Sequence, residues 1–330
     1  MLRQLATHNR YPYSPITRRP DYTWPDGKRL AVYLGFNLEH FEFGQGLGAK
    51  LAPSGDPDVL NYAWRDYGNR VGVWRCRDLF DELKLPLGLL INTALYDYCP
   101  EVIAAFRKDQ YAWGAEVIGH GHTNAERQGD MSEDAEQKLI AACSARIAKE
   151  EGVVPRGWLS PWISESAVTP DLLKEAGYAY NLNWCHDDQP QKMATRAGDL
   201  WTIPYPQEIN DIPAVIGRQC GAEEFADMII DCYDEMMVQA TGTTPKRAPG
   251  FGAAGAVNAA GAANAVGVPG GAGARAGQPL VMGIALHPYL VGQPHRLRQL
   301  RRALQHICND GRAWWTTPGQ ILDHITAQGM

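Results

Sequence analysis

Apolar runs and segments of helical periodicity alternate along most of the chain. Residues 29–37 form a continuous apolar run that is typical of a buried strand, and residues 70–84 repeat apolar positions at helical spacing. The alternation continues to the carboxyl end. Further strands are expected at 86–92, 115–119, 154–158, 179–183, 200–204, 280–287 and 312–316, and further helices near 100–108, 133–150, 169–177, 222–239 and 295–308 and after Thr317-Pro318.

Capping residues stand at the ends of several expected helices. Ser132 can accept a hydrogen bond from the first turn of the helix at 133–150, and Gly152 follows the end of that helix. Thr169-Pro170 and Thr317-Pro318 each combine a cap with a first-turn proline. Seven or eight such β/α repeats predict an α/β fold in which helices cover parallel strands, as in a barrel or a doubly wound sheet.

One stretch interrupts the pattern before the strand expected at 280–287. From Ala248 to Ala274 the chain contains 8 Gly and 11 Ala in 27 residues and no charged side chain. Such a segment has little side-chain surface to offset the entropy of ordering it, so it is either a loop without a role or a lid. We expect one domain over residues 29–330, preceded by an N-terminal arm at 1–28 and interrupted by a low-complexity insert at 243–277.

Composition and charge narrow the class of protein. The chain is 45% hydrophobic and 21% charged, which is typical of a folded protein. Its net charge is −6 and it has no basic block, which argues against a nucleic-acid partner. No apolar run is long enough to span a membrane, and we find no secretory signal at the amino end. The seven scattered cysteines include no C-x-x-C pair. We therefore expect a cytoplasmic enzyme without a membrane partner.

Polar and ionisable residues stand where several expected strands end. In a barrel, side chains at the carboxyl ends of the strands face the active site. The candidates are Asn37 and Glu39 after the first strand, His120 and His122 after the third, Arg156 and Trp158 around the fourth, Asp187 and Asp188 after the fifth, and His287 at the end of the late strand.

Each candidate also has a structural interpretation. Glu39 follows an apolar strand, so its carboxylate either neutralises an arginine such as Arg156 or acts as a general base whose pKa is raised by burial. His120 is open to three roles: metal ligand, oxyanion donor or ordinary loop histidine. His287 ends an apolar strand, where an idle imidazole is unexpected. The pair Asp187-Asp188 is by itself typical of a solvated turn.

Six sequence blocks together resemble the polysaccharide-deacetylase (NodB-homology) superfamily, and within it the branch that contains bacterial metal-independent allantoinase. The resemblance implies a distorted (β/α) barrel, usually of seven strands. It also implies hydrolysis of a carbon–nitrogen bond other than a peptide bond, in an N-acetylated amino sugar or a cyclic amide. The blocks are Trp24-Pro-Asp-Gly, Asn37-Leu-Glu39, the run from Tyr67 to Arg75, Gly119-His120-Gly121, Asp187-Asp188-Gln-Pro190 and the run from Leu286 to Pro294.

The chain departs from the metal-dependent members of that superfamily, which place two carboxylates after the first strand and use two histidines four residues apart. Here Asn37 stands at the position of the base and Asn124 follows His120 by four. A zinc site needs three protein ligands. Glu39 and His120 supply two, and the third would be His122 or Asn124. The allantoinase branch therefore favours chemistry without a tightly bound metal, and a divalent metal such as zinc is the alternative.

The resemblance implies a mechanism for a small-molecule amide substrate. Glu39 takes a proton from water, His120, backbone amides or a loosely bound cation hold the oxyanion, and His287 protonates the leaving nitrogen. Asn37, Arg156 and Trp158 are expected to shape the pocket, and Asp187 and Asp188 to bind substrate or hold their loop. The alternatives are a metal-dependent N-deacetylase of an amino sugar or peptidoglycan fragment, and an inactive barrel with a binding role. Family resemblance also suggests a homo-oligomer.

Overall fold

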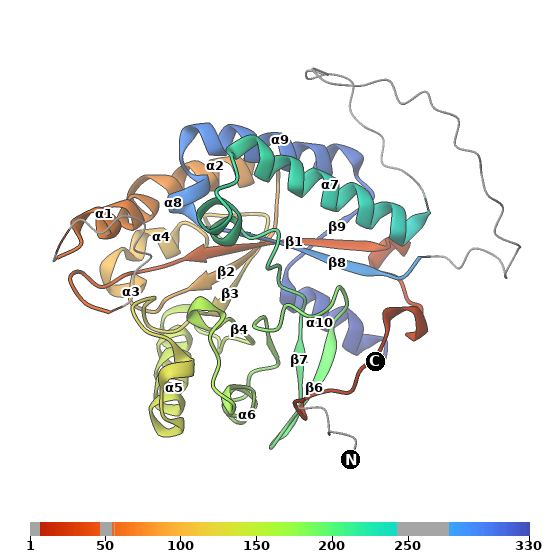
Figure 1. Cartoon of the computed structure of the whole chain (residues 1–330), viewed down its shortest axis with the longest axis horizontal. Helices are drawn as coiled ribbons and strands as arrows, with labels where there is room; N and C mark the ends of the chain where they lie inside the picture. The colour runs from red at the N-terminus through yellow and green to blue at the C-terminus, as the bar shows by residue number, and fades with distance from the viewer. Residues whose placement is uncertain (1–6, 47–54, 56, 243–276) are drawn as a thin grey trace, which may run out of the picture.

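A mostly parallel β-sheet forms the centre of the molecule in the computed structural model, which describes residues 7–46, 55, 57–242 and 277–330 (Figure 1). The strand order is β6-β7-β5-β4-β3-β2-β1-β8, and β9 also pairs with β1. Only the β6–β7 pair is antiparallel among these ladders. The strands are β1 (Leu30–Leu38), β2 (Leu87–Ile91), β3 (Ala115–Gly119), β4 (Gly157–Trp158), β5 (Tyr180–Asn181), β6 (Gln191–Thr195), β7 (Gly198–Thr202), β8 (Leu280–Leu286) and β9 (Trp314–Trp315).

Helices follow most of the strands and pack on the sheet. Figure 1 shows α7 and α9 side by side along β1 and β8, with α10 on the opposite side of these strands. The expected α/β fold is therefore confirmed. The helices are α1 (Val59–Tyr67), α2 (Val73–Glu82), α3 (Leu95–Tyr98), α4 (Pro100–Ala104), α5 (Glu133–Glu151), α6 (Thr169–Glu175), α7 (Ala222–Thr241), α8 (Pro288–Val291), α9 (Pro294–Asp310) and α10 (Pro318–Ala327).

The free edge of β8 is covered by irregular chain. The backbone N–H of Val281 donates to the carbonyl of Asp188, and that of Ala285 donates to the carbonyl of Ile209. These bonds bring the segments on either side of the β6–β7 hairpin against β8. The strand ladders of the described residues do not form a complete ring, so the architecture is a distorted, incompletely closed barrel.

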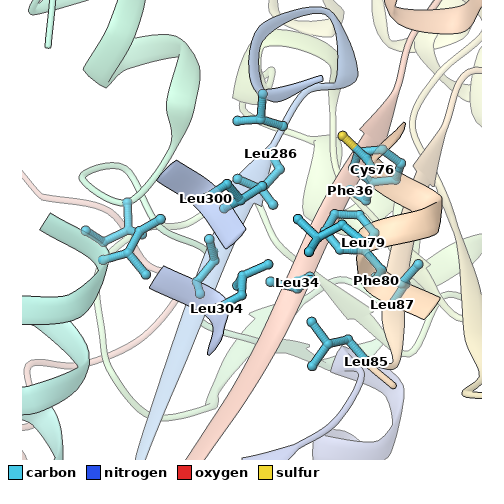
Figure 2. Close-up of a cluster of buried hydrophobic side chains, with 14 of the residues drawn as sticks. Leu34, Phe36, Cys76, Leu79, Phe80, Leu85, Leu87, Leu286, Leu300 and Leu304 are labelled. Atoms are coloured by element: carbon cyan, nitrogen blue, oxygen red, sulfur yellow. The ribbon is translucent and has the colours of Figure 1, made fainter. Parts of the chain in front are cut away.

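The hydrophobic core lies against β1, whose nine residues are all buried. Figure 2 shows Leu34 and Phe36 of β1 facing side chains of α2 and α9, among them Phe80 and Leu304. Complete burial of one such side chain contributes about 1.5–3 kcal/mol. Because β1 is held by packing and by neighbouring strands on both sides, the residue that follows it has a fixed position.

The helix expected at 70–84 is part of a longer element. It begins as α1 at Val59, passes through a π-helical segment at Gly68–Gly72 and continues as α2. Helix α1 was not predicted from the sequence, although Asp58 caps it. A Cβ atom on Gly72 would lie 2.1 Å from the carbonyl oxygen of Pro288, so this glycine lets α8 approach closely.

Other boundaries differ where the local chemistry is unfavourable. The strand expected at 154–158 shortens to β4, because Pro155 has no N–H to donate to a neighbouring strand. Thr169 is not the cap of α6 but its first residue, and its hydroxyl donates to Glu136. The caps Ser132 and Thr317 are confirmed, since each accepts a hydrogen bond from the first turn of its helix.

Two further predictions concern the Gly/Ala-rich insert and the absence of a membrane-spanning helix. The Gly/Ala-rich insert lies outside them, apart from its last residue, Gly277. The described residues at its two ends are placed: Gly242, just before the insert, ends α7, and Gly277 precedes β8 and lies against Gln239. Within the described part of the chain, the helices are too short or too polar to cross a membrane.

Candidate active site

Three polar side chains meet at the carboxyl edge of the sheet. Glu39 directly follows β1, His120 directly follows β3 and His287 directly follows β8, and these strands are parallel. The Oε1 atom of Glu39 lies 3.5 Å from Nε2 of His120 and 3.4 Å from Nε2 of His287. All three side chains are buried. The structure therefore brings together the three residues expected to carry the chemistry.

Amide donors form hydrogen bonds with both the carboxylate and the backbone of Glu39. The Nδ2 atom of Asn124 donates to Oε1 at 2.6 Å, and Nδ2 of Asn69 donates to the backbone carbonyl of Glu39 at 2.8 Å. Burial alone would raise the pKa of Glu39, but the nearby His287 and His120 outweigh this effect and lower it. The expectation of a raised pKa is therefore wrong, and Glu39 is ionised near neutral pH.

His287 contacts a carboxylate that was not selected from the sequence. The Oδ1 atom of Asp211 lies 2.6 Å from Nδ1 of His287, and Oδ2 accepts the backbone N–H of His287 at 2.7 Å. Burial lowers the pKa of His287, but Asp211 and then Glu39 more than offset this, so the pKa rises to about 9. Burial raises the pKa of Asp211, and His287 opposes that rise. His287 is therefore a cation at neutral pH, with its Nε2 proton directed at Glu39.

A backbone carbonyl determines which ring nitrogen of His120 carries a hydrogen. Its Nδ1 atom lies 2.7 Å from the backbone carbonyl of Leu159, which can only accept, so Nδ1 carries a hydrogen. Its Nε2 atom, like Oε2 of Glu39, is buried and has no hydrogen-bond partner among the described residues. These two polar atoms are the free positions at which a small polar group can bind next to Glu39.

The three side chains line a cavity of about 220 Å³. Asn37 also lines it, and its Nδ2 donates to the hydroxyl of Tyr205 at 3.0 Å. One arginine, Arg65 of α1, also lines this cavity, and it was not among the residues selected from the sequence. The walls are otherwise mainly apolar or amide groups: Phe41, Asn124, Leu159, Trp162, Ile163, Tyr205, Gln207, Asn210, Ile212 and Pro213.

Four of the five residues expected to shape the pocket or bind substrate do not line this cavity. Arg156 directly precedes β4, so it lies at the amino edge of the sheet, opposite the edge that carries Glu39. It forms an ion pair with Asp323 of α10. Trp158 is completely buried in the core. Asp187 forms a two-pronged ion pair with Arg19 of the N-terminal arm. The backbone carbonyl of Asp188 accepts a hydrogen bond from the N–H of Val281 at the edge of β8.

A tightly bound metal does not fit the donors that the structure describes. No group of three or more His, Cys, Asp or Glu residues with metal-binding geometry is found among them. His122 is exposed and its Nδ1 contacts the hydroxyl of Thr93, so it does not face Glu39. The Asn124 amide directs its N–H toward Glu39, and its oxygen accepts from Asn92. Neither proposed third ligand is available in this arrangement, and we derive no step through a metal.

Curated relatives resemble the chain over most of its length. A protein of Schizosaccharomyces pombe that is named as a polysaccharide deacetylase is 23% identical over 95% of this chain and 94% of its own length. A peptidoglycan deacetylase of Helicobacter pylori is 25% identical over 78% of this chain and 84% of its own length. The expected resemblance to polysaccharide deacetylases is confirmed. No family model matches the chain.

Solved structures of polysaccharide deacetylase-like proteins share this fold. A probable polysaccharide deacetylase of Pseudomonas aeruginosa PAO1 superimposes with a TM-score of 0.73, at 22% identity over 95% of this chain and 97% of its own. The PuuE allantoinase gives a TM-score of 0.72, at 22% identity over 96% and 98%. The two values are almost equal, so the fold does not distinguish the substrate of a deacetylase from that of an allantoinase.

Proposed function

We propose that this polysaccharide deacetylase-like protein hydrolyses a carbon–nitrogen bond in a small amide or cyclic ureide such as allantoin. One observation carries the proposal: the carboxylate of Glu39 and the imidazole of His287 face each other at 3.4 Å in a cavity. A general base must be deprotonated and a general acid protonated before the reaction starts. The pKa shifts of both residues favour these states near neutral pH.

The first chemical step follows from the free positions around Glu39. Water bound between Oε2 of Glu39 and Nε2 of His120 attacks the carbonyl carbon of the amide. A carbon–oxygen bond forms, the carbonyl π electrons move to oxygen, and Glu39 takes one proton from the water. The positive charge of His287, held by Asp211, stabilises the resulting oxyanion.

The second step breaks the carbon–nitrogen bond. The oxyanion reforms the carbonyl group, the electron pair of the broken bond moves to nitrogen, and His287 donates the proton that nitrogen needs. The products are a carboxylic acid and an amine, which remain in one molecule when the substrate is cyclic. The proton on Glu39 then returns to His287 over the 3.4 Å separation, and the starting ionisation states are restored.

The size of the cavity supports a small substrate. Sites for drug-sized ligands usually measure about 300–1,000 Å³. The cavity here, at about 220 Å³, is smaller and matches a single heterocycle or short amide better than a sugar oligomer. Trp162 and Tyr205 on its walls can contact a planar ureide.

A substrate panel with and without chelator tests the proposal. The panel contains allantoin, hydantoin, linear amides, N-acetylglucosamine and its oligomers. We expect hydrolysis of a ureide or small amide that persists with chelator, and well under one equivalent of zinc per purified chain by elemental analysis. Cleavage of acetylated sugars alone, abolished by chelator and restored by zinc, would establish the metal-dependent deacetylase instead. No hydrolysis of any substrate would favour the inactive barrel.

A further inference from the structure

Arg65 is a buried cation at the cavity wall without a carboxylate partner among the described residues. It is 4% exposed and lies in the second turn of α1. Its guanidinium carbon lies 3.8 Å from the ring centre of Phe41 and 4.9 Å from that of Tyr289. Its Nη1 donates to the hydroxyl of Tyr289 at 3.1 Å, and its Nε has no partner. Burying such a charge is costly unless an anion offsets it.

Other largely buried arginines of this chain show the usual solution. Arg10 forms an ion pair with Asp171 at 2.7 Å, and Arg19 forms one with Asp187 at 2.6 Å. The acidic neighbours of Arg65 are engaged elsewhere. Asp66 accepts from the hydroxyl of Tyr98, and Glu39 is surrounded by Asn124 and the two histidines.

We infer that Arg65 binds a carboxylate carried by the substrate, so that the enzyme acts on an anionic amide or ureide. This inference rests on the proposed function, because Arg65 and Glu39 line the same cavity. A planar guanidinium donates two parallel hydrogen bonds to a carboxylate, and the aromatic rings around Arg65 hold it in one orientation. A small cavity in which Arg65 is the one arginine among the described lining residues fits a carboxylate better than a bulkier, doubly charged phosphate.

A charge-matched ligand pair tests the inference. Hydantoin-5-acetate and hydantoin-5-acetamide have nearly the same shape and differ in charge. Their affinities are measured by calorimetry in the Glu39→Gln variant, which leaves the ligands intact. We expect the acetate to bind at least about tenfold more tightly than the acetamide, since hydrogen bonds to charged groups contribute about 1.5–3 kcal/mol and 1.4 kcal/mol is tenfold. In Glu39→Gln/Arg65→Met the preference should disappear.

Three results would overturn the assignment: equal affinity for the two ligands, no measurable binding of either, or a preference that persists without Arg65. Failure here and failure of the proposed function are distinguishable. Hydrolysis of neutral ureides without an acetate preference would leave the function and refute the anion site. A preference for the acetate that depends on Arg65, without hydrolysis of any panel substrate, would support the anion site and refute the proposed function.

Stability measurements separate ligand binding from a structural role. Methionine fills the aromatic surroundings of Arg65 without a charge, so Arg65→Met should unfold at the same temperature as the wild type or at a higher one. Arg65→Lys keeps the charge but loses the planar fork, and should retain only part of the preference for acetate. A clear fall in the unfolding temperature of Arg65→Met would show that Arg65 serves the fold.

Discussion

At the scale of single residues, each catalytic candidate depends on a neighbour that sets its charge. Asp211 contacts both Nδ1 and the backbone N–H of His287, which fixes the ring and keeps it protonated. Glu39 in turn is kept ionised by the two histidines that face it. The proposed mechanism therefore requires that Asp211 and Glu39 are anions on either side of the His287 cation.

This arrangement predicts the pH dependence of activity. His287 must be protonated to act as the acid, and its pKa is about 9, so kcat/KM should fall as the pH rises through about 9. In Asp211→Asn the pKa should move down toward the ordinary histidine value of about 6.5, and activity should already fall near neutral pH. We also expect a loss of at least about 100-fold at the optimum.

The check is kcat/KM measured from pH 5 to 10 for both proteins, with unfolding temperatures as a control for stability. A high-pH limb that stays at the same position in Asp211→Asn would show that Asp211 does not set the ionisation of His287.

The sequence identified some site residues and missed others for physical reasons. Glu39, His120 and His287 directly follow apolar strands, and parallel strands place such residues at one edge. Asp211 directly precedes a short π-helical segment, Ile212–Gly217, which no hydrophobic periodicity predicts, and its partner His287 is 76 residues away. Arg65 was missed because α1 itself was not predicted. Arg156 was misplaced because β4 begins only at Gly157, so that Arg156 stands before the amino end of the strand.

At the scale of elements, the junction between the first helices and α8 positions His287. The π-helical segment at Gly68–Gly72 packs against α8, which directly follows His287. Neither feature was expected from the sequence, because close backbone packing leaves a glycine as its only trace. A side chain at this junction should therefore affect the site as well as the fold.

Gly72→Ala tests this junction. The new methyl group would lie 2.1 Å from the carbonyl of Pro288, so the backbones must separate. We expect a loss of about 1–3 kcal/mol in the free energy of unfolding and a lower kcat, because His287 moves with α8. Gly217→Ala is the control, since a Cβ atom at Gly217 has no neighbour within 4 Å. Equal stability of the two variants would mean that α8 does not depend on this contact.

The Gly/Ala-rich insert gives a second test at this scale. Gly242 precedes it and Gly277 is its last residue, next to the amino end of β8 and opposite the edge that carries His287. Replacing residues 243–277 by a short Gly/Ser turn should leave kcat/KM unchanged and stability equal or slightly higher, because loop length has a small entropic effect of about 0.6 kcal/mol per doubling. Limited proteolysis and kinetics check this. A folded deletion variant that no longer binds substrate would show that the insert reaches the site.

At the scale of the whole molecule, ion pairs join the N-terminal arm to the rest of the fold. Arg10 and Arg19 of the arm pair with Asp171 and Asp187 of the central part of the chain. The order of strands and helices was predictable because most elements are long and periodic. The short bounds of β4, β5 and β9, the pairing of β6 with β7 and the bonds that cover β8 depend on contacts distant in sequence, and local pattern does not encode them.

The central claim is that Glu39 is the base of a carbon–nitrogen bond hydrolase, and the most direct test is kcat/KM for Glu39→Gln on the best substrate of the panel. Glutamine keeps the volume and the hydrogen bond with Asn124 but cannot take a proton. We predict a fall of about 10²–10⁴-fold with an unchanged circular dichroism spectrum. Glu82→Gln, an exposed carboxylate paired with Arg301, should retain wild-type activity. Near-normal turnover by folded Glu39→Gln would contradict the account.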